Sequence, residues 1–168
     1  MTRMDRLIGH QFRVRPFKEL PTPYQLAMTY YMAIDGEAWD LTCDCLTARL
    51  DAEILKRELI NVRKRYGETL FGTALISTKR LIEAVLQDEY IVQNYPDREA
   101  YQADLLNNWE VPEHPRTQRW PVILSSSDEE TLQDGWHRFN CYVRDQHRTI
   151  PAVFYPKPRH LRAIGISQ

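Results

Sequence analysis

The sequence predicts an α/β (α+β) fold, built as one domain around a mixed sheet with a mostly helical insertion. Two observations support this prediction. Short apolar runs with the lengths of strands lie near both ends of the chain, and longer segments between them carry apolar residues at helical spacing. The chain has 168 residues and 43% hydrophobic content, which is enough for one packed core. We therefore assign residues 1–168 to a single compact domain.

Four strands are expected; one of them, Trp120 to Ser125, is a short apolar run bounded by polar turn residues, and Thr149 to Tyr155 also has a strand pattern. They lie near Phe12 to Pro16, Trp120 to Ser125, Glu130 to Gln133 and Thr149 to Tyr155. The serines and carboxylates between the second and third runs predict an exposed turn.

The helices are predicted from caps and from apolar spacing. Thr22 and Pro23 are typical of a helix start, and that helix continues to Asp35-Gly36. Residues 36–115 form the insertion, which we expect to be mostly helical. Its helices are expected from Ala48 to Tyr66, after Ser77 or Thr78, and from Asp97 to Trp109. Residues 156–168 are basic and contain prolines, which favours an extended C-terminal tail.

The segment after Asp134 predicts a helix start that suits an anion. Beyond Gly135 the apolar residues take helical spacing, and the first turn of such a helix has unpaired backbone N–H groups at its positive end. Arg138 can form a bidentate pair of hydrogen bonds with a phosphate, and His137 can donate one more hydrogen bond to it. Asp134 can orient an arginine, bind magnesium or act as a general base. The alternative is structural: Arg138 pairs with Asp134 or with a surface glutamate, and His137 caps the helix.

Two separated segments resemble the ParB/sulfiredoxin superfamily. The run from Asp134 to Tyr142, followed by Arg148-Thr149-Ile150-Pro151-Ala152, resembles its Gly-x-His-Arg segment and the Ile-Pro strand after it. Val14-Arg15-Pro16-Phe17 resembles the first strand of sulfiredoxins, whose arginine faces a bound phosphate. The resemblance implies a compact mixed sheet with a phosphate site made of Arg15 from the neighbouring strand together with Gly135, His137 and Arg138.

The chain also departs from these families at positions that carry their chemistry. Trp136 stands where sulfiredoxins place the catalytic cysteine, so sulfinic acid reduction is excluded. Gln25, Met28 and Met32 replace the lysine, serine and threonine that hold ATP in sulfiredoxins. The chain ends soon after Tyr155, without the helix-turn-helix of ParB proteins, so the resemblance is to a stand-alone member.

Two functional hypotheses follow. The first is a phosphate-ligand protein that binds a nucleotide or a nucleic acid backbone. If it is an enzyme, the resemblance implies a nucleotide hydrolase, a phosphotransferase or a nuclease of plasmid or phage type, with a nucleotide triphosphate and magnesium as cofactors and Asp134 as the base. The second is a non-catalytic protein-interaction module that retains the fold. In that case the surface that binds a partner protein would be formed by the helical insertion together with Trp39, Trp109 and Trp136.

Composition limits both hypotheses. The net charge is −1 and the calculated pI is near 6.5, so attraction to nucleic acid requires a local basic patch. The sequence has no apolar run long enough to span a bilayer and no signal-peptide core, so a cytoplasmic location without membrane contact is expected. Cys43, Cys45 and Cys141 are too few for a disulfide framework, and we expect no metal site and a buried Cys141.

Overall fold

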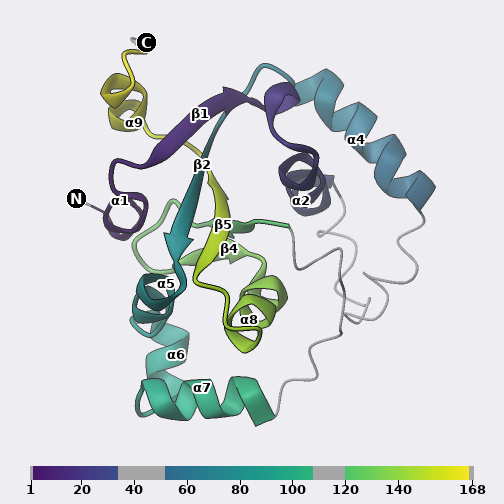
Figure 1. Cartoon of the computed structure of the whole chain (residues 1–168). Coiled ribbons are helices and arrows are strands. Elements are labelled where there is room, and N and C mark those ends of the chain that lie inside the picture. The colour runs from purple at the N-terminus through teal and green to yellow at the C-terminus, as the bar shows by residue number, and fades with distance from the viewer. Residues whose placement is uncertain (1, 34–51, 108–119, 167–168) are drawn as a thin grey trace.

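The computed structural model describes residues 2–33, 52–107 and 120–166, and it confirms the α/β class. A five-stranded mixed sheet has helices on both faces (Figure 1). In chain order the elements are α1 (Arg3–Ile8), β1 (Phe12–Pro16), η1 (Phe17–Glu19), α2 (Thr22–Ala33), α4 (Ala52–Tyr66), β2 (Leu70–Ser77), α5 (Thr78–Val85), α6 (Glu89–Asn94), α7 (Arg98–Asn107), β3 (Val122–Leu124), β4 (Leu132–Asp134), α8 (Trp136–Arg144), β5 (Thr149–Phe154) and α9 (Pro158–Ala163).

The strands are ordered β1-β2-β5-β3-β4 across the sheet. Neighbouring strands are antiparallel except β3 and β5, which are parallel. The strands β1 and β4 are therefore the two edges, and β2 and β5 lie inside the sheet.

The two faces of the sheet have separate cores, because side chains alternate along each strand. One face packs against α1, α5 and α8 and buries Ala74, Ile76, Val122, Leu124, Ala152 and Phe154. The other face packs against α2 and α4 and buries Phe71, Ile123 and Val153. The helix stripe predicted after Gly135 is confirmed, since Phe139 and Tyr142 are buried in the first core.

The prediction of a mostly helical insertion is wrong at one important place. Residues 70–77 form β2, which pairs with both β1 and β5. A close approach fixes its register: Gly72 lies opposite Phe154, and a Cβ at position 72 would come within 2.2 Å of the Phe154 ring. The strand was missed because it is buried on both faces over part of its length, so its sequence shows no clear alternation.

The remaining differences are local. The strand β4 begins at Leu132 and ends at Asp134, slightly later than predicted, and the turn before it is confirmed. The C-terminal segment is not extended throughout, because Pro158 opens the short helix α9. Helices α4, α5 and α7 agree with the predicted helices within the described residues, whereas α6 was not predicted. Residues Cys43, Cys45, Trp39 and Trp109 lie outside the described ranges.

Asp5 joins the N- and C-terminal helices, which lie near each other beside β1 (Figure 1), through a hydrogen bond with His160 and an ion pair with Arg159. The Nδ1 atom of His160 accepts a hydrogen bond from the Lys157 N–H at 2.9 Å, so its Nε2–H donates to Asp5 Oδ1 at 2.7 Å. Arg159 also pairs with Asp5, at 2.6 Å. Burial alone would raise the pKa of Asp5, but hydrogen bonds from His160 and Thr2 and the charge of Arg159 lower it to about 2.

Candidate functional site

The turn that was predicted to bind phosphate lies between β4 and α8. Gly135 adopts φ 96° and ψ 25°, a left-handed conformation that glycine adopts without strain. A Cβ at this position would lie 2.9 Å from Arg138 Nη2 and 3.1 Å from Val122 Cα. Gly135 is the N-cap residue of α8 and has no side chain, so it provides no side-chain acceptor for the first backbone N–H groups of the helix.

The side chain of Arg138 is turned toward the protein. Its Nη2 lies 2.6 Å from Asp134 Oδ2, and its guanidinium stacks 6.0 Å from the centre of the Trp120 ring. Only 7% of Arg138 is exposed. The structural alternative from the sequence is thus observed for this arginine. A phosphate at this place would compete with the Asp134 carboxylate, and the ion pair also occupies the predicted general base.

The neighbours of this ion pair make a packed cluster. The Tyr142 hydroxyl donates to the Trp120 carbonyl oxygen at 3.0 Å, which ties α8 to the chain entering β3. Burial raises the pKa of Tyr142 and also that of Tyr24, so both hydroxyls are neutral at neutral pH. The side chain of His137 lies outside the described atoms, and its role stays a prediction together with the phosphate roles of Gly135 and Arg138.

The predicted position of Arg15 beside this turn is wrong. Arg15 lies on β1 and Asp134 ends β4, and these two strands are opposite edges of the sheet. Four strand spacings separate these two strands, which is about 19 Å across the sheet. Arg15 and Arg138 therefore cannot hold the same phosphate group. Three strands, β2, β5 and β3, lie between β1 and β4, and β2 was not predicted.

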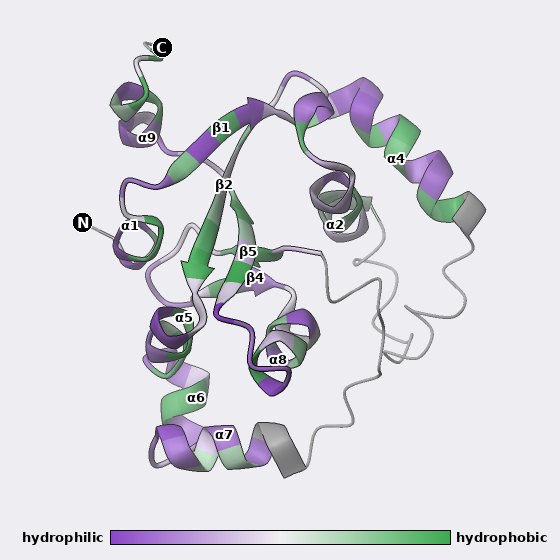
Figure 2. Ribbon diagram, in the orientation of Figure 1, coloured by the Kyte–Doolittle hydropathy of each residue, from purple (hydrophilic) through white to green (hydrophobic). Residues whose placement is uncertain are grey.

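Arg15 instead belongs to an open part of the sheet. On β1, Phe12 packs into the core on the α8 side, so alternation places Arg13 and Arg15 on the opposite face, where both are exposed. Figure 2 shows the corresponding hydrophilic and hydrophobic bands along β1. Cross-strand register extends this face over the two neighbouring strands. We call it the basic sheet face and define it as Arg13, Arg15, Thr73, Leu75, Thr149, Pro151 and Tyr155.

Helices α2 and α4 cover only one end of this side of the sheet. Phe71 and Val153 are buried beneath them, but Leu75 is 67% exposed and Tyr155 is 40% exposed. Pro151 lies directly opposite Leu75 on β5. An exposed leucine on an inner strand leaves apolar surface open at the middle of the sheet.

The strands of the basic sheet face carry positively charged side chains and no negatively charged ones. The strands β1, β2 and β5 contain no aspartate or glutamate. Neither Arg13 nor Arg15 forms an ion pair or a side-chain hydrogen bond with the part of the chain that is described. Nearby, Arg65 on α4 lies 5.3 Å from the centre of the Tyr66 ring. The face therefore presents two free guanidinium groups beside aromatic and apolar surface.

Sequence reasoning missed Arg13, Leu75 and Tyr155 as members of one surface. The alternation Arg13-Val14-Arg15 was a usable signal, since residues two apart on a strand share a face. Leu75 had no such signal, because its face is set by the pairing of β2, which was not predicted.

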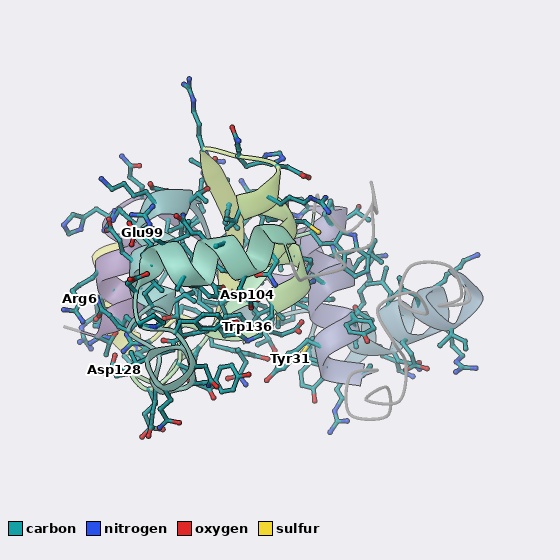
Figure 3. The ribbon with its side chains drawn as sticks, turned by 90° about the horizontal axis from the view of Figure 1, so that it is seen from below. Arg6, Tyr31, Glu99, Asp104, Asp128 and Trp136 are labelled. Atoms are coloured by element: carbon teal, nitrogen blue, oxygen red, sulfur yellow. The ribbon has the colours of Figure 1, made fainter. Side chains whose placement is uncertain are left out.

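The helical insertion contributes a separate surface. Tyr90 and Val92 on α6 are 71% and 61% exposed, and Tyr90 lines an open hollow of about 520 Å³ between α6 and α7. Trp136, expected as an exposed partner contact, is only partly exposed and packs edge-to-face on Phe139. In the view from below, Trp136 is seen beneath α7, on the same side of the molecule as Asp104 (Figure 3).

In residues 2–33, 52–107 and 120–166, no three or more histidine, cysteine or carboxylate side chains are grouped so as to hold a metal ion. None of the described helices combines the length and apolarity needed to cross a membrane. Cys141 is buried, as predicted.

Comparison of the chain with family models, with curated proteins and with solved structures finds no match. The resemblance to the ParB/sulfiredoxin superfamily thus depends on the two sequence segments alone, and membership stays a prediction.

Proposed function

We propose that this protein binds the phosphate backbone of a nucleic acid through the basic sheet face. One observation supports the proposal above the others: Arg13 and Arg15 are exposed, have no acidic partner and lie on the same face of three strands without acidic residues. Guanidinium groups bind phosphate oxygens with two parallel hydrogen bonds, and nucleic acids are their most abundant polyanionic targets.

The shape of the face favours a polymer over a single nucleotide. A pocket that recognises a small ligand buries most of that ligand, whereas the face around Leu75 and Tyr155 is open. Arg13 and Arg15 follow β1 about 7 Å apart, which suits successive phosphates along a backbone. Nucleotide triphosphate binding with magnesium remains the weaker form of the original hypothesis.

The proposal is for binding and not for catalysis. Asp134 is the predicted general base, but it is paired with Arg138 and lies at the far edge of the sheet from Arg15. Nuclease, hydrolase or phosphotransferase activity would need a reactive group beside the basic sheet face, and such activity stays a prediction.

The test is fluorescence anisotropy with labelled oligonucleotides at several salt concentrations. The double variant Arg13→Ala/Arg15→Ala should weaken binding by about tenfold or more, and the salt slope should fall by about 1.4 for single strands because two phosphate contacts are lost. The matched control is Lys56→Ala/Lys79→Ala, which removes the same charge from exposed positions on α4 and α5. Its affinity should stay within about twofold of wild type.

Two results would overturn the proposal. The first is the absence of wild-type binding to every oligonucleotide at low salt. The second is an equal loss of affinity in the control variant, because that would indicate a diffuse charge effect. Circular dichroism of each variant checks that the fold is retained.

A second candidate is a protein-binding surface on α6 and α7, favoured by the exposure of Tyr90 and Val92 on α6 and by the hollow that Tyr90 lines. If wild type fails to bind nucleic acid, partner proteins should be sought with the intact chain as bait. The matched negative bait is Tyr90→Asp/Val92→Asp, which should lose a specific partner.

A further inference from the structure

We propose that the ligand of the basic sheet face is single-stranded nucleic acid, with a base stacked on Tyr155 while Arg13 and Arg15 hold phosphates. This inference rests on the proposed function and adds the class of nucleic acid. Its basis is the juxtaposition of free arginines, an exposed aromatic ring and exposed apolar surface on one face of the sheet.

The geometry places charge and ring in one row across the sheet. Arg15 on β1 lies opposite Phe71 on β2, and Tyr155 directly follows Phe154, which pairs with Gly72. The rings of Phe71 and Tyr155 are 5.0 Å apart between centroids. Two strand spacings, about 10 Å, separate the backbones at Arg15 and Tyr155. Phe71 lies between them and is fully buried under Phe17 and the helices, so a flexible strand that contacts both Arg15 and Tyr155 runs over the elements that cover Phe71.

The Tyr155 ring is held in place rather than free. It is 40% exposed, and its inner side contacts Phe71, which is fully buried. Burial raises the pKa of Tyr155, with smaller contributions from Tyr31 and Tyr66, so the hydroxyl carries no negative charge that would repel a phosphate. A preorganised neutral ring is a suitable platform for base stacking, which costs little side-chain entropy here.

The apolar part of the face separates single strands from duplexes. The bases of a duplex are already stacked on each other and cannot stack on Tyr155. The charged backbone of a duplex also makes no favourable apolar contact with Leu75 and Pro151. An unpaired base can cover this apolar surface, and Leu75 is 67% exposed and so available to it. A duplex would be held through Arg13 and Arg15 alone.

The experiment compares single strands and duplexes of the same mixed sequence, as RNA and as DNA, by fluorescence anisotropy with the full chain. Wild type should bind the single strand about fivefold or more tightly than the duplex, and Tyr155→Ala should reduce single-strand affinity about tenfold. Tyr155→Phe keeps the ring and should stay within about twofold of wild type. Tyr90→Ala removes a tyrosine that is 71% exposed on α6 and should have no effect.

The outcomes separate this inference from the proposed function. Equal affinity for duplex and single strand, with no effect of Tyr155→Ala and a loss in Arg13→Ala/Arg15→Ala, would refute base stacking while leaving backbone binding intact. No binding to either form would refute both. Competition by polyglutamate as effective as by unlabelled single strand would also refute the inference, because it would show recognition of charge alone. Unchanged duplex affinity in Tyr155→Ala confirms that the variant is folded.

Discussion

Replacement of Arg138 by alanine should destabilise the fold rather than remove ligand binding. The guanidinium is 8% exposed, and its Asp134 partner is 20% exposed at an N–O distance of 2.6 Å. Breaking a fully buried pair from one side costs about 3–5 kcal/mol, because the remaining charge stays unpaired. The partial exposure of Asp134 allows some hydration, so we expect about 2–3 kcal/mol for Arg138→Ala. That is a large part of the total stability of a typical domain.

A double-mutant cycle tests this reasoning. Asp134→Asn keeps an oxygen that can accept from Arg138 and should cost about 1 kcal/mol, the difference between a charged and a neutral hydrogen bond. When Arg138 is replaced by alanine, an unpaired neutral amide at position 134 destabilises the folded state less than an unpaired carboxylate does. The double variant should therefore be more stable than the sum of the single effects predicts, by about 1–2 kcal/mol.

Urea unfolding followed by tryptophan fluorescence measures these free energies, provided that the m-value is unchanged. The structural interpretation of Arg138 is refuted if Arg138→Ala changes the free energy of unfolding by less than about 0.5 kcal/mol, the usual effect of a surface substitution. If the same variant also lost nucleic acid or phosphate binding, the start of α8 would be the functional site. We expect its oligonucleotide affinity to equal that of wild type.

Two further predictions concern packing and charge elsewhere in the fold. Gly72→Ala should lower the free energy of unfolding by about 1–3 kcal/mol, because the new methyl group overlaps the buried Phe154 ring; thermal melting without a lowered midpoint would contradict this. Asp5 has a folded pKa of about 2, below its ordinary 3.8, so its contribution to stability is present above pH 4 and is lost as the pH falls toward 2. Asp5→Asn should remove about 1–2 kcal/mol of that acid-sensitive stability, and acid titrations of both proteins by circular dichroism would measure it.

The sequence predicted local structure better than the placement of strands. The helix stripe after Gly135 and the buried Cys141 were predictable, because spacing and residue type determine them locally. The position of Arg15 was not, because it depends on which strand pairs with β1. That partner is β2, whose residues 70–77 are buried on both faces over part of the strand and lack the usual alternation.

The observed arrangement of the candidate site differs from the predicted one for the same reason. A resemblance between short motifs carries residue types but not the distances between them, and in this fold β2, β5 and β3 lie between Arg15 on β1 and Asp134 at the end of β4. The resemblance also could not show that Arg138 is paired with Asp134, because both interpretations require the same two residues at the same spacing.

Arg13 and Arg15 differ from Arg138 in what the fold gains from them. Arg138 packs against Trp120 and neutralises Asp134, so the folded state itself accounts for its charge. Arg13 and Arg15 are exposed and have no described partner, so replacing them should change stability by no more than about 0.5 kcal/mol. Folding therefore gives no reason for two positive charges at these positions, whereas a bound polyanion does. Their removal is also the cleaner experiment, because any loss of binding would occur in a protein of almost unchanged stability.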